Sequence, residues 1–190
     1  MQPLELYIHI PFCVKKCAYC DFLSGPAGEK EKEEYVKMLV DEIRNCPDTV
    51  QNYRVISIFF GGGTPSLLTG EQIWRLMDTV REIFTLDEDA EITMEMNPGT
   101  VTEEKLRKYR QAGVNRLSIG LQSVNDEELR LLGRIHTYEE FREAYHLARA
   151  NGFSNINVDL ISAIPGQTVE SWRRTLERVM ALSPEHISAY

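Results

Sequence analysis

Residues 55–96 read VISIFFGGGTPSLLTGEQIWRLMDTVREIFTLDEDAEITMEM. The stretch begins with an apolar run of β-branched and aromatic residues, Val55–Phe60, which is typical of a buried strand. A glycine-rich turn follows, and Gly70–Phe84 then carries apolar residues at helical spacing before a second β-rich run at Glu91–Met96. This order predicts two parallel strands joined through a helix by a right-handed crossover.

The same alternation continues on both sides of this unit. Thr102 and Thr137 stand where helix N-caps are expected, and Gly113 and Gly152 stand where helices are expected to end. The other expected strands are Leu6–Ile10, Arg116–Leu121, Asn155–Ile161 and His186–Tyr190, and the other expected helices are Glu29–Arg44, Thr102–Ala112, Asp126–Leu132, Tyr138–Ala150 and Val169–Met180. We therefore expect one α/β domain over residues 1–190. Its parallel sheet is of either the doubly wound or the barrel type, which periodicity does not distinguish.

The last expected strand lies at the end of the sequence, which stops at Tyr190. No helix follows to cover that strand. Either the sequence is a fragment, or the strand forms an exposed edge that favours association with another chain. We favour the fragment.

The composition is that of a globular protein with an acidic balance. The 190 residues contain 21 Lys and Arg against 29 Asp and Glu, which gives a formal charge of −8, and 43% of them are hydrophobic. An excess of negative charge disfavours binding to nucleic acid or to an anionic membrane, so we expect neither as a partner. No apolar run reaches the ~20 residues of a membrane span, and residues 1–5 carry no signal-peptide features, so we expect a cytoplasmic protein.

Three of the four cysteines lie in residues 13–20, which read CVKKCAYC. Clustered cysteines in a reducing compartment indicate metal ligation, and this C-x3-C-x2-C spacing suits zinc or an iron–sulfur cluster. A structural zinc site usually has four ligands in paired motifs, and His9 is the one nearby candidate for a fourth. Three ligands fit a [4Fe–4S] cluster with one iron left open for a ligand. The alternative of three structural thiols is less favoured, and we assign Cys46 no role.

A second group of candidate residues follows the expected strands. Gly61, Gly62 and Gly63 lack Cβ atoms and could bring the backbone against a ligand, although a glycine turn alone is weak evidence. Polar residues occur at or near three strand ends, namely Glu95, Gln122 and Asp159. In parallel sheets this rim is where ligands bind. The alternative is that Glu95 and Asp159 pair with Arg or Lys neighbours or cap helices.

Arg134 and His136 fall in a turn between two expected helices. An arginine there could clamp a carboxylate with two hydrogen bonds, although in such a turn an exposed surface arginine is the more frequent case. Lys15 and Lys16 could offset the charge of a cluster or could face water.

Together these motifs resemble the radical S-adenosylmethionine (SAM) superfamily, in particular its group similar to oxygen-independent coproporphyrinogen III oxidases. The resemblance covers nearly the whole chain and is carried by residues 7–13, YIHIPFC, 60–66, FGGGTPS, 95–98, EMNP, 114–123, VNRLSIGLQS, 132–137, LGRIHT, 155–161, NINVDLI, 165–168, PGQT, and 186–190, HISAY. Within this group the oxidases carry a further cysteine two residues after the third. This chain instead has Asp21 and Phe22 after Cys20, which resembles the HemW-type haem chaperone branch. That branch continues beyond the length of this chain, into the region to which it assigns haem contacts.

The resemblance implies a partial (β/α)6 TIM-like barrel that lacks its final helix. It implies that Cys13, Cys17 and Cys20 hold a [4Fe–4S] cluster whose fourth iron is chelated by SAM. By matching position, the residues implied to contact SAM are Tyr7, Gly62, Gly63, Thr64, Glu95, Gln122, Arg134 and Asp159. Such proteins use one electron to cleave the sulfonium of SAM and generate a radical.

Three hypotheses follow, two from the resemblance and one from the cysteines alone. The first is a haem-trafficking protein whose partners are haem or a porphyrin, a haem-accepting protein and an electron donor such as flavodoxin or ferredoxin. The second is a radical SAM oxidoreductase of the coproporphyrinogen oxidase type, acting in porphyrin biosynthesis. The third is a structural zinc domain.

Overall fold

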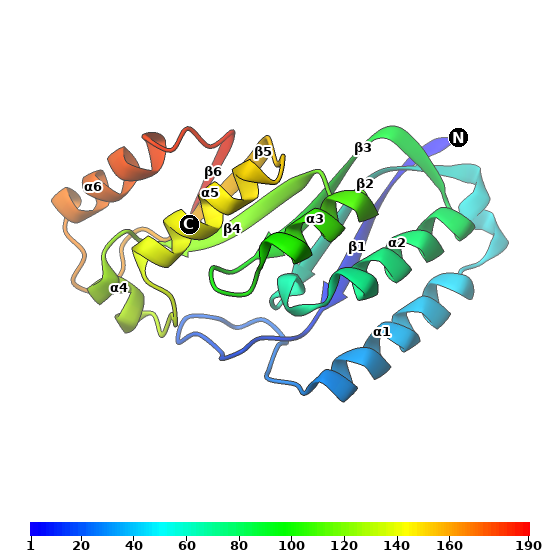
Figure 1. Ribbon diagram of the computed structural model, residues 1–190, viewed down its shortest axis with the longest axis horizontal. Helices are drawn as coiled ribbons and strands as arrows, with labels where there is room; N and C mark the ends of the chain where they lie inside the picture. The colour runs from blue at the N-terminus through cyan, green and yellow to red at the C-terminus, as the bar shows by residue number, and fades with distance from the viewer.

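A computed structural model describes residues 1–190, which fold into one parallel sheet and six α-helices (Figure 1). The strands are β1 (Gln2–Ile10), β2 (Tyr53–Gly62), β3 (Thr85–Met96), β4 (Arg116–Gln122), β5 (Asn155–Leu160) and β6 (His186–Ala189). The α-helices are α1 (Glu29–Arg44), α2 (Gly70–Ile83), α3 (Glu103–Ala112), α4 (Asp126–Leu131), α5 (Tyr138–Ala150) and α6 (Val169–Met180). Two short 3₁₀ turns, Asp48–Asn52 and Pro65–Leu67, precede β2 and α2.

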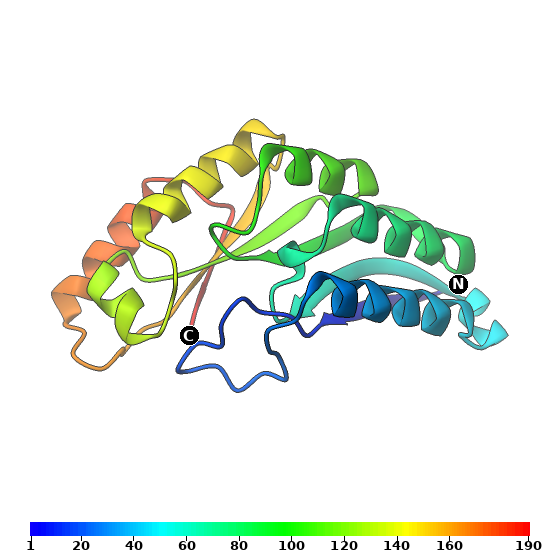
Figure 2. The same cartoon turned by 60° about the horizontal axis from the view of Figure 1, so that its bottom comes forward.

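The strands lie side by side in chain order, from β1 to β6, and each neighbouring pair is parallel. Right-handed crossovers that always move in one direction place every helix on the same face, as Figure 2 shows. A doubly wound sheet is thereby excluded, because it needs a point where the strand order reverses. The sheet has the order of a partial barrel, and it is open because β1 and β6 do not pair. No helix of the chain is long and apolar enough to cross a membrane.

Strand alternation explains which face is covered. In β1 the side chains of Ile8 and Ile10 are buried under the helices, whereas Tyr7 is exposed on the other face. The buried side chains of the sheet and helices form one cluster of 34 apolar residues. The opposite, helix-free face carries the polar side chains of Thr93, Glu95, Ser118, Asn157 and Asp159.

Most expected elements are confirmed, but β1 and β3 begin several residues earlier than expected. β1 begins at Gln2 instead of Leu6, and β3 begins at Thr85 instead of Glu91. The first part of β3 contains Asp87, Glu88 and Asp89, and it pairs with β2 at Thr85 and Leu86 before the register shifts. These charged residues interrupt the apolar alternation that would predict a strand. The first part of β3 is nevertheless a strand, because its backbone pairs with β2.

The expected helix caps are confirmed. The side chains of Thr102 and Thr137 accept hydrogen bonds from backbone N–H groups in the first turns of α3 and α5. Gly113 ends α3 in the left-handed conformation, with a φ of 108°. These local signals fix the points at which the chain returns to the sheet.

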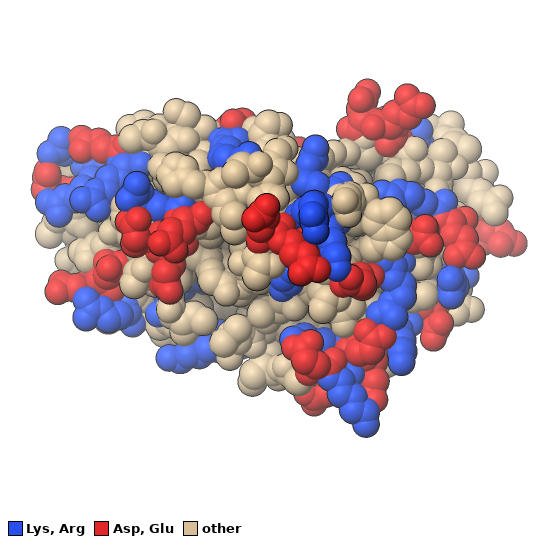
Figure 3. Space-filling model, viewed as in Figure 1, with Lys and Arg blue, Asp and Glu red and all other residues tan.

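Acidic and basic side chains are interspersed over the helix-covered face (Figure 3). Many of them form ion pairs within or between helices, for example Arg173 with Glu170 and Glu177 on α6, and Lys108 of α3 with Glu71 of α2. These exposed pairs contribute little each to stability, so the fold depends mainly on its apolar cluster.

Candidate functional site

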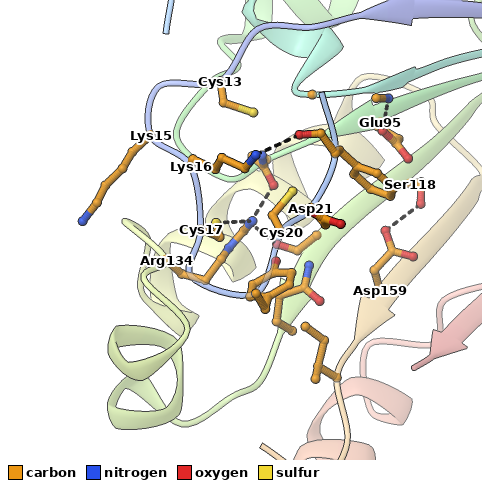
Figure 4. Close-up of a pocket in the computed structure, with 18 of the residues that line it drawn as sticks. Cys13, Lys15, Lys16, Cys17, Cys20, Asp21, Glu95, Ser118, Arg134 and Asp159 are labelled. Atoms are coloured by element: carbon orange, nitrogen blue, oxygen red, sulfur yellow. Dashed lines mark hydrogen bonds between the residues drawn. The ribbon is translucent and has the colours of Figure 1, made fainter. Parts of the chain in front are cut away.

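A cavity of about 610 Å³ lies where the carboxyl ends of the strands meet the cysteine-containing loop that follows β1 (Figure 4). Nine of the eleven residues expected at the site line it, namely Cys13, Cys17, Cys20, Gly62, Gly63, Glu95, Gln122, Arg134 and Asp159. The register of the sheet produces this gathering, because Ile10 pairs with Gly62 and Gly120 pairs with Asp159. The site is therefore at the rim where parallel sheets bind ligands.

The other two expected residues lie outside the cavity lining. Thr64 is buried behind it, and its Oγ1 lies 3.6 Å from the Cys13 Sγ. Tyr7 is exposed on the helix-free face of β1, where its hydroxyl lies 3.3 Å from His9 Nδ1. Thr64 thus reaches the site through a cysteine. Burial, together with the charge of the cavity-lining Glu95, raises the pKa of Tyr7, so Tyr7 lies beside the cavity.

The cysteine loop is fixed at its base and near its middle. Cys13 N–H donates to Gly25 O at 2.9 Å, and Gly25 N–H donates back to Pro11 O at 3.0 Å, which closes the loop at its base. Ala18 N–H donates to Leu132 O at 3.0 Å, which ties the loop to the end of α4. Backbone hydrogen bonds therefore hold the three cysteines on one side of the cavity.

The three thiols are free and partly exposed, as metal-ligating cysteines must be before they bind. They do not converge to the distances that a single ion such as zinc requires, and no other group of three His, Cys, Asp or Glu side chains does so. A [4Fe–4S] cluster binds each cysteine at a separate iron, so its ligands need not meet at one point. The donor set, three soft thiolates on one loop, fits such a cluster.

The glycines after β2 first serve packing. A Cβ on Gly63 would lie 2.6 Å from Phe12 O, and a Cβ on Gly62 would lie 2.3 Å from the His9 ring. The Gly63 N–H donates to Ile10 O, and the Gly62 N–H donates to Glu95 Oε2 at 3.0 Å. The absence of side chains here therefore lets the cysteine loop approach β2, and these two N–H groups are already bonded within the protein.

Glu95 and Asp159 are half-buried carboxylates, and neither forms an ion pair with an Arg or Lys side chain, although the charge of Arg116 acts on Asp159. Burial raises the pKa of Glu95 to about 7, the Gly62 N–H opposes the shift, and the nearby Asp159 adds to it. Burial also raises the pKa of Asp159, in spite of hydrogen bonds from Ser118 at 2.9 Å and Asn157 at 2.9 Å. Two such carboxylates favour a ligand that carries positive charge.

The Arg134 side chain points into the site. The alternative of an exposed surface arginine, which is the more frequent case in such a turn, is therefore wrong. Its Nη2 donates to Asn97 Oδ1 at 2.6 Å and to Gly120 O at 2.7 Å, and its Nη1 lies 3.8 Å from Cys17 Sγ (Figure 4). Its buried Nε has no hydrogen-bond partner. A buried donor without an acceptor is costly, and a ligand carboxylate would satisfy it.

Gln122 has a left-handed backbone, with a φ of 75°, at a shift of register between β4 and β5. Such a conformation is unfavourable for a residue other than glycine, and it re-aims the strand end at the cavity. A Cβ on Gly120 would lie 2.9 Å from Asn97 Oδ1 and 3.3 Å from Arg134 Nη2, so a side chain there would disturb the hydrogen bond between Asn97 and Arg134.

The remaining residues considered from the sequence lie at the margins of the site. His136 is buried, with Nε2 at 3.3 Å from Leu121 O, and burial together with the Arg134 charge lowers its pKa to about 4. Lys15 and Lys16 line the cavity, and Lys16 Nζ donates to Phe22 O at 3.1 Å. Cys46 packs against the apolar cluster at the end of α1.

Sequence reasoning did not single out Asn97, Ser118 and Tyr190, which also line the cavity. Asn97 follows Glu95 by two positions, and Ser118 precedes Gly120 by two. Residues two apart in a strand lie on the same face, so this alternation was the signal that could have placed them at the site. Tyr190 reaches the cavity because β6 ends beside β5, with Tyr190 N–H bonded to Leu160 O at 2.9 Å.

Comparisons with known proteins show the family to which the chain belongs. The family model of the radical SAM superfamily matches residues 7–179. The chain is 46% identical over 191 residues to a protein of Escherichia coli (strain K12) named heme chaperone HemW. This match covers 100% of this chain and 50% of that protein. It is 39% identical over 190 residues to oxygen-independent coproporphyrinogen III oxidase of Salmonella typhimurium, covering 100% of this chain and 42% of that protein.

Among solved structures, coproporphyrinogen III oxidase (HemN) from Escherichia coli, described as a radical SAM enzyme, matches with a TM-score of 0.90 and 38% identity, over 100% of this chain and 44% of that one. This chain belongs to the radical SAM superfamily. It is similar to both HemW proteins and coproporphyrinogen oxidases, and it spans about half the length of the curated relatives it matches. Membership of the superfamily implies a [4Fe–4S] cluster and SAM.

Proposed function

We propose that the chain is the radical SAM portion of a haem chaperone of the HemW type, which binds haem or a porphyrin and delivers haem to an acceptor protein. The observation that carries the proposal is the pair Asp21 and Phe22, which follow Cys20 and line the cavity. The oxidase branch has a further cysteine at the second of these positions. The identity of 46% to HemW of Escherichia coli supports the same assignment.

In this proposal Cys13, Cys17 and Cys20 hold a [4Fe–4S] cluster and leave one iron open for the amino and carboxylate groups of SAM. When bound, such a cluster would supply the one-electron reducing chemistry that cleaves a sulfonium. Tyr7, Gly62, Gly63, Thr64, Glu95, Gln122, Arg134 and Asp159 are proposed to contact or position SAM.

The charges of the site fit this cofactor. The unpartnered Arg134 Nε supplies a donor for the methionyl carboxylate, with Nη2 already held by Asn97 and Gly120. Glu95 and Asp159 supply negative charge for the ammonium, the sulfonium or the ribose hydroxyls. Tyr7 is exposed on the helix-free face near Glu95, and it would contact a ligand that extends from the cavity along this face.

Electron paramagnetic resonance of anaerobically reconstituted, dithionite-reduced protein tests the cofactor part of the proposal. A [4Fe–4S]+ signal that changes when SAM is added is the expected result. A cluster signal indifferent to SAM contradicts the open iron, and zinc in place of iron in anaerobically purified protein supports the structural zinc hypothesis.

The haem part is tested on the full-length protein, because this chain covers half of its relatives. The full-length protein with an intact cluster is expected to retain haem at a stoichiometric ratio and to transfer it to an apo-acceptor. Failure to retain haem while the cluster is present contradicts the chaperone assignment.

A second candidate function is a radical SAM oxidoreductase of the coproporphyrinogen III oxidase type. The observation that favours it is the lining of the cavity, where nine expected residues are retained although a carrier does not need all of them. The structural match to HemN is also close, with a TM-score of 0.90. Decarboxylated product after incubation of reduced full-length protein with coproporphyrinogen and SAM would support this function, and its absence under turnover conditions counts against it.

The proposed chemistry also needs an electron donor such as flavodoxin or ferredoxin, and these donors are found in the cytoplasm, where we place the protein. Reduction of the cluster by purified flavodoxin or ferredoxin tests the first point. Cell fractionation with an antibody to the chain tests the second.

A further inference from the structure

The Asn97 side chain, at the end of β3, lies between the two residues that contact the cysteine sulfurs. Its Nδ2 donates to Thr64 Oγ1 at 2.8 Å, and its Oδ1 accepts from Arg134 Nη2 at 2.6 Å. Thr64 Oγ1 in turn lies 3.6 Å from Cys13 Sγ, and Arg134 Nη1 lies 3.8 Å from Cys17 Sγ. A continuous chain of hydrogen bonds therefore joins the two sulfurs through three side chains, and we call it the Thr64–Asn97–Arg134 relay.

The direction of each hydrogen bond in the relay follows from chemistry. The guanidinium of Arg134 offers only N–H donors, so the atom of Asn97 that faces it must be the carbonyl oxygen. The amide nitrogen of Asn97 then faces Thr64, whose oxygen must accept. The Thr64 hydroxyl proton is thereby left to point at Cys13.

Asn97 and Thr64 are held in place for this arrangement. The Asn97 N–H lies 3.4 Å from Ser66 Oγ, and Thr100 Oγ1 donates to the Asn97 carbonyl at 2.7 Å. Thr64 is 3% exposed, and its N–H donates to Phe12 O in the cysteine loop at 2.7 Å. The Thr64 hydroxyl is buried and already accepts a hydrogen bond from Asn97. Water therefore does not compete with Cys13 for the proton of this hydroxyl.

We propose that Asn97 is a positioning residue that directs the Thr64 hydroxyl to Cys13 and the Arg134 guanidinium to Cys17, and thereby raises the reduction potential of the cluster. This inference rests on the proposed cluster site. Hydrogen bonds donated to ligating sulfurs favour the reduced cluster, because it carries one more negative charge than the oxidised form.

The test compares cluster midpoint potentials by redox titration, followed by electron paramagnetic resonance, in variants with measured iron content. Asn97→Leu removes the amide at similar volume, and Thr64→Val removes the hydroxyl at similar shape. Both are expected to lower the potential, whereas Thr64→Ser, which keeps the hydroxyl, stays close to the wild type. Thr79→Val is the matched control, because Thr79 is equally buried in α2 and bonds only Arg75 O.

The double variant tests whether the residues act as one relay. If Asn97 acts partly through Thr64, the shift caused by Asn97→Leu is smaller in the Thr64→Val background than in the wild type. Additive shifts overturn the link between the two residues.

The outcomes separate this inference from the proposed function. An unchanged potential in Asn97→Leu, with full iron content, overturns the relay and leaves the cluster assignment intact. If Asn97→Leu loses the cluster, the midpoint potential of Thr64→Val decides. An unchanged midpoint potential in that variant again overturns the relay. A wild type without any cluster overturns the proposed function and the relay together.

Discussion

Glu95 is a carboxylate that the fold holds partly buried without a cation. Its pKa of about 7 in the folded protein exceeds the ordinary value of 4.5, so its contribution to stability is complete below pH 4.5 and is lost as the pH rises through 7. Glu95→Gln is therefore expected to raise the free energy of unfolding at pH 8 by about 2 kcal/mol. Urea denaturation of both proteins at pH 8 and at pH 4.5 measures this difference. An equal gain in the free energy of unfolding at the two pH values would contradict the raised pKa of Glu95.

The same carboxylate should make cofactor binding depend on pH. A cationic ligand prefers the ionised form of Glu95, and that form increases about tenfold between pH 6 and pH 8 for a pKa near 7. SAM affinity of the reconstituted wild type is expected to rise accordingly over this range. Calorimetric titration of Glu95→Gln should give weaker binding with a flatter pH dependence, and an unchanged slope in this variant contradicts the prediction.

Residues of the site differ in how far their sequence predicts them. Glu95 and Asp159 could be predicted because a carboxylate inside an apolar strand needs a reason to be there. The contacts of Asn97 could not, because they join segments 33 and 37 residues apart and depend on side-chain directions that a sequence pattern does not give. Tyr7 is the opposite case, since only its motif predicts a contact, and an exposed tyrosine in a strand gives no signal of its own.

At the scale of elements, α4 is attached to the start of α6 by one buried carboxylate. Glu128 accepts hydrogen bonds from Ser123 Oγ at 2.6 Å, from Gln167 Nε2 at 2.9 Å and from Ser171 Oγ. Burial opposes ionisation, but these donors together hold the pKa of Glu128 below its usual value. Gln122 is the last residue of β4, and the turn that contains Ser123 follows it. The Glu128 carboxylate thus fixes this turn relative to α6.

Glu128→Ala is expected to destabilise the protein by about 2–3 kcal/mol, because it leaves several partly buried donors without an acceptor. Glu127→Ala is the matched control, since it removes the same charge from an exposed position on the same helix. Thermal unfolding followed by circular dichroism measures both variants. Equal melting temperatures for the two would show that Glu128 contributes no more than a surface charge.

Element boundaries were predictable wherever a local signal exists. The Thr caps and the glycine after α3 determine helix ends within a few residues, so expectation and structure agree there. The first half of β3 has no such signal. Its strand conformation comes from pairing with β2 across a register shift, which is a tertiary effect.

For the whole molecule, the sequence predicted parallel strands and crossover helices but not their lateral order. That order depends on the direction each crossover takes, which no single segment encodes. The consecutive order found here brings the ends of β2, β3, β4 and β5 around one cavity, and the open side between β1 and β6 leaves the helix-free face uncovered. The placement of the cysteine loop follows from the same order, because the loop extends from β1 across the ends of the later strands.

The apolar cluster connects this whole arrangement, so residues 1–190 are expected to unfold in one cooperative transition. Buried residues from Val36 of α1 to Val179 of α6 belong to the same cluster, and Trp172 packs against it from α6. In a Trp74→Phe variant, Trp172 fluorescence reports the α6 end while far-ultraviolet circular dichroism reports all elements. Coincident urea curves are expected from the two probes. An earlier change in fluorescence would show that α6 and β6 separate from a more stable β1–β5 unit, and the single domain expected from the sequence would then be wrong.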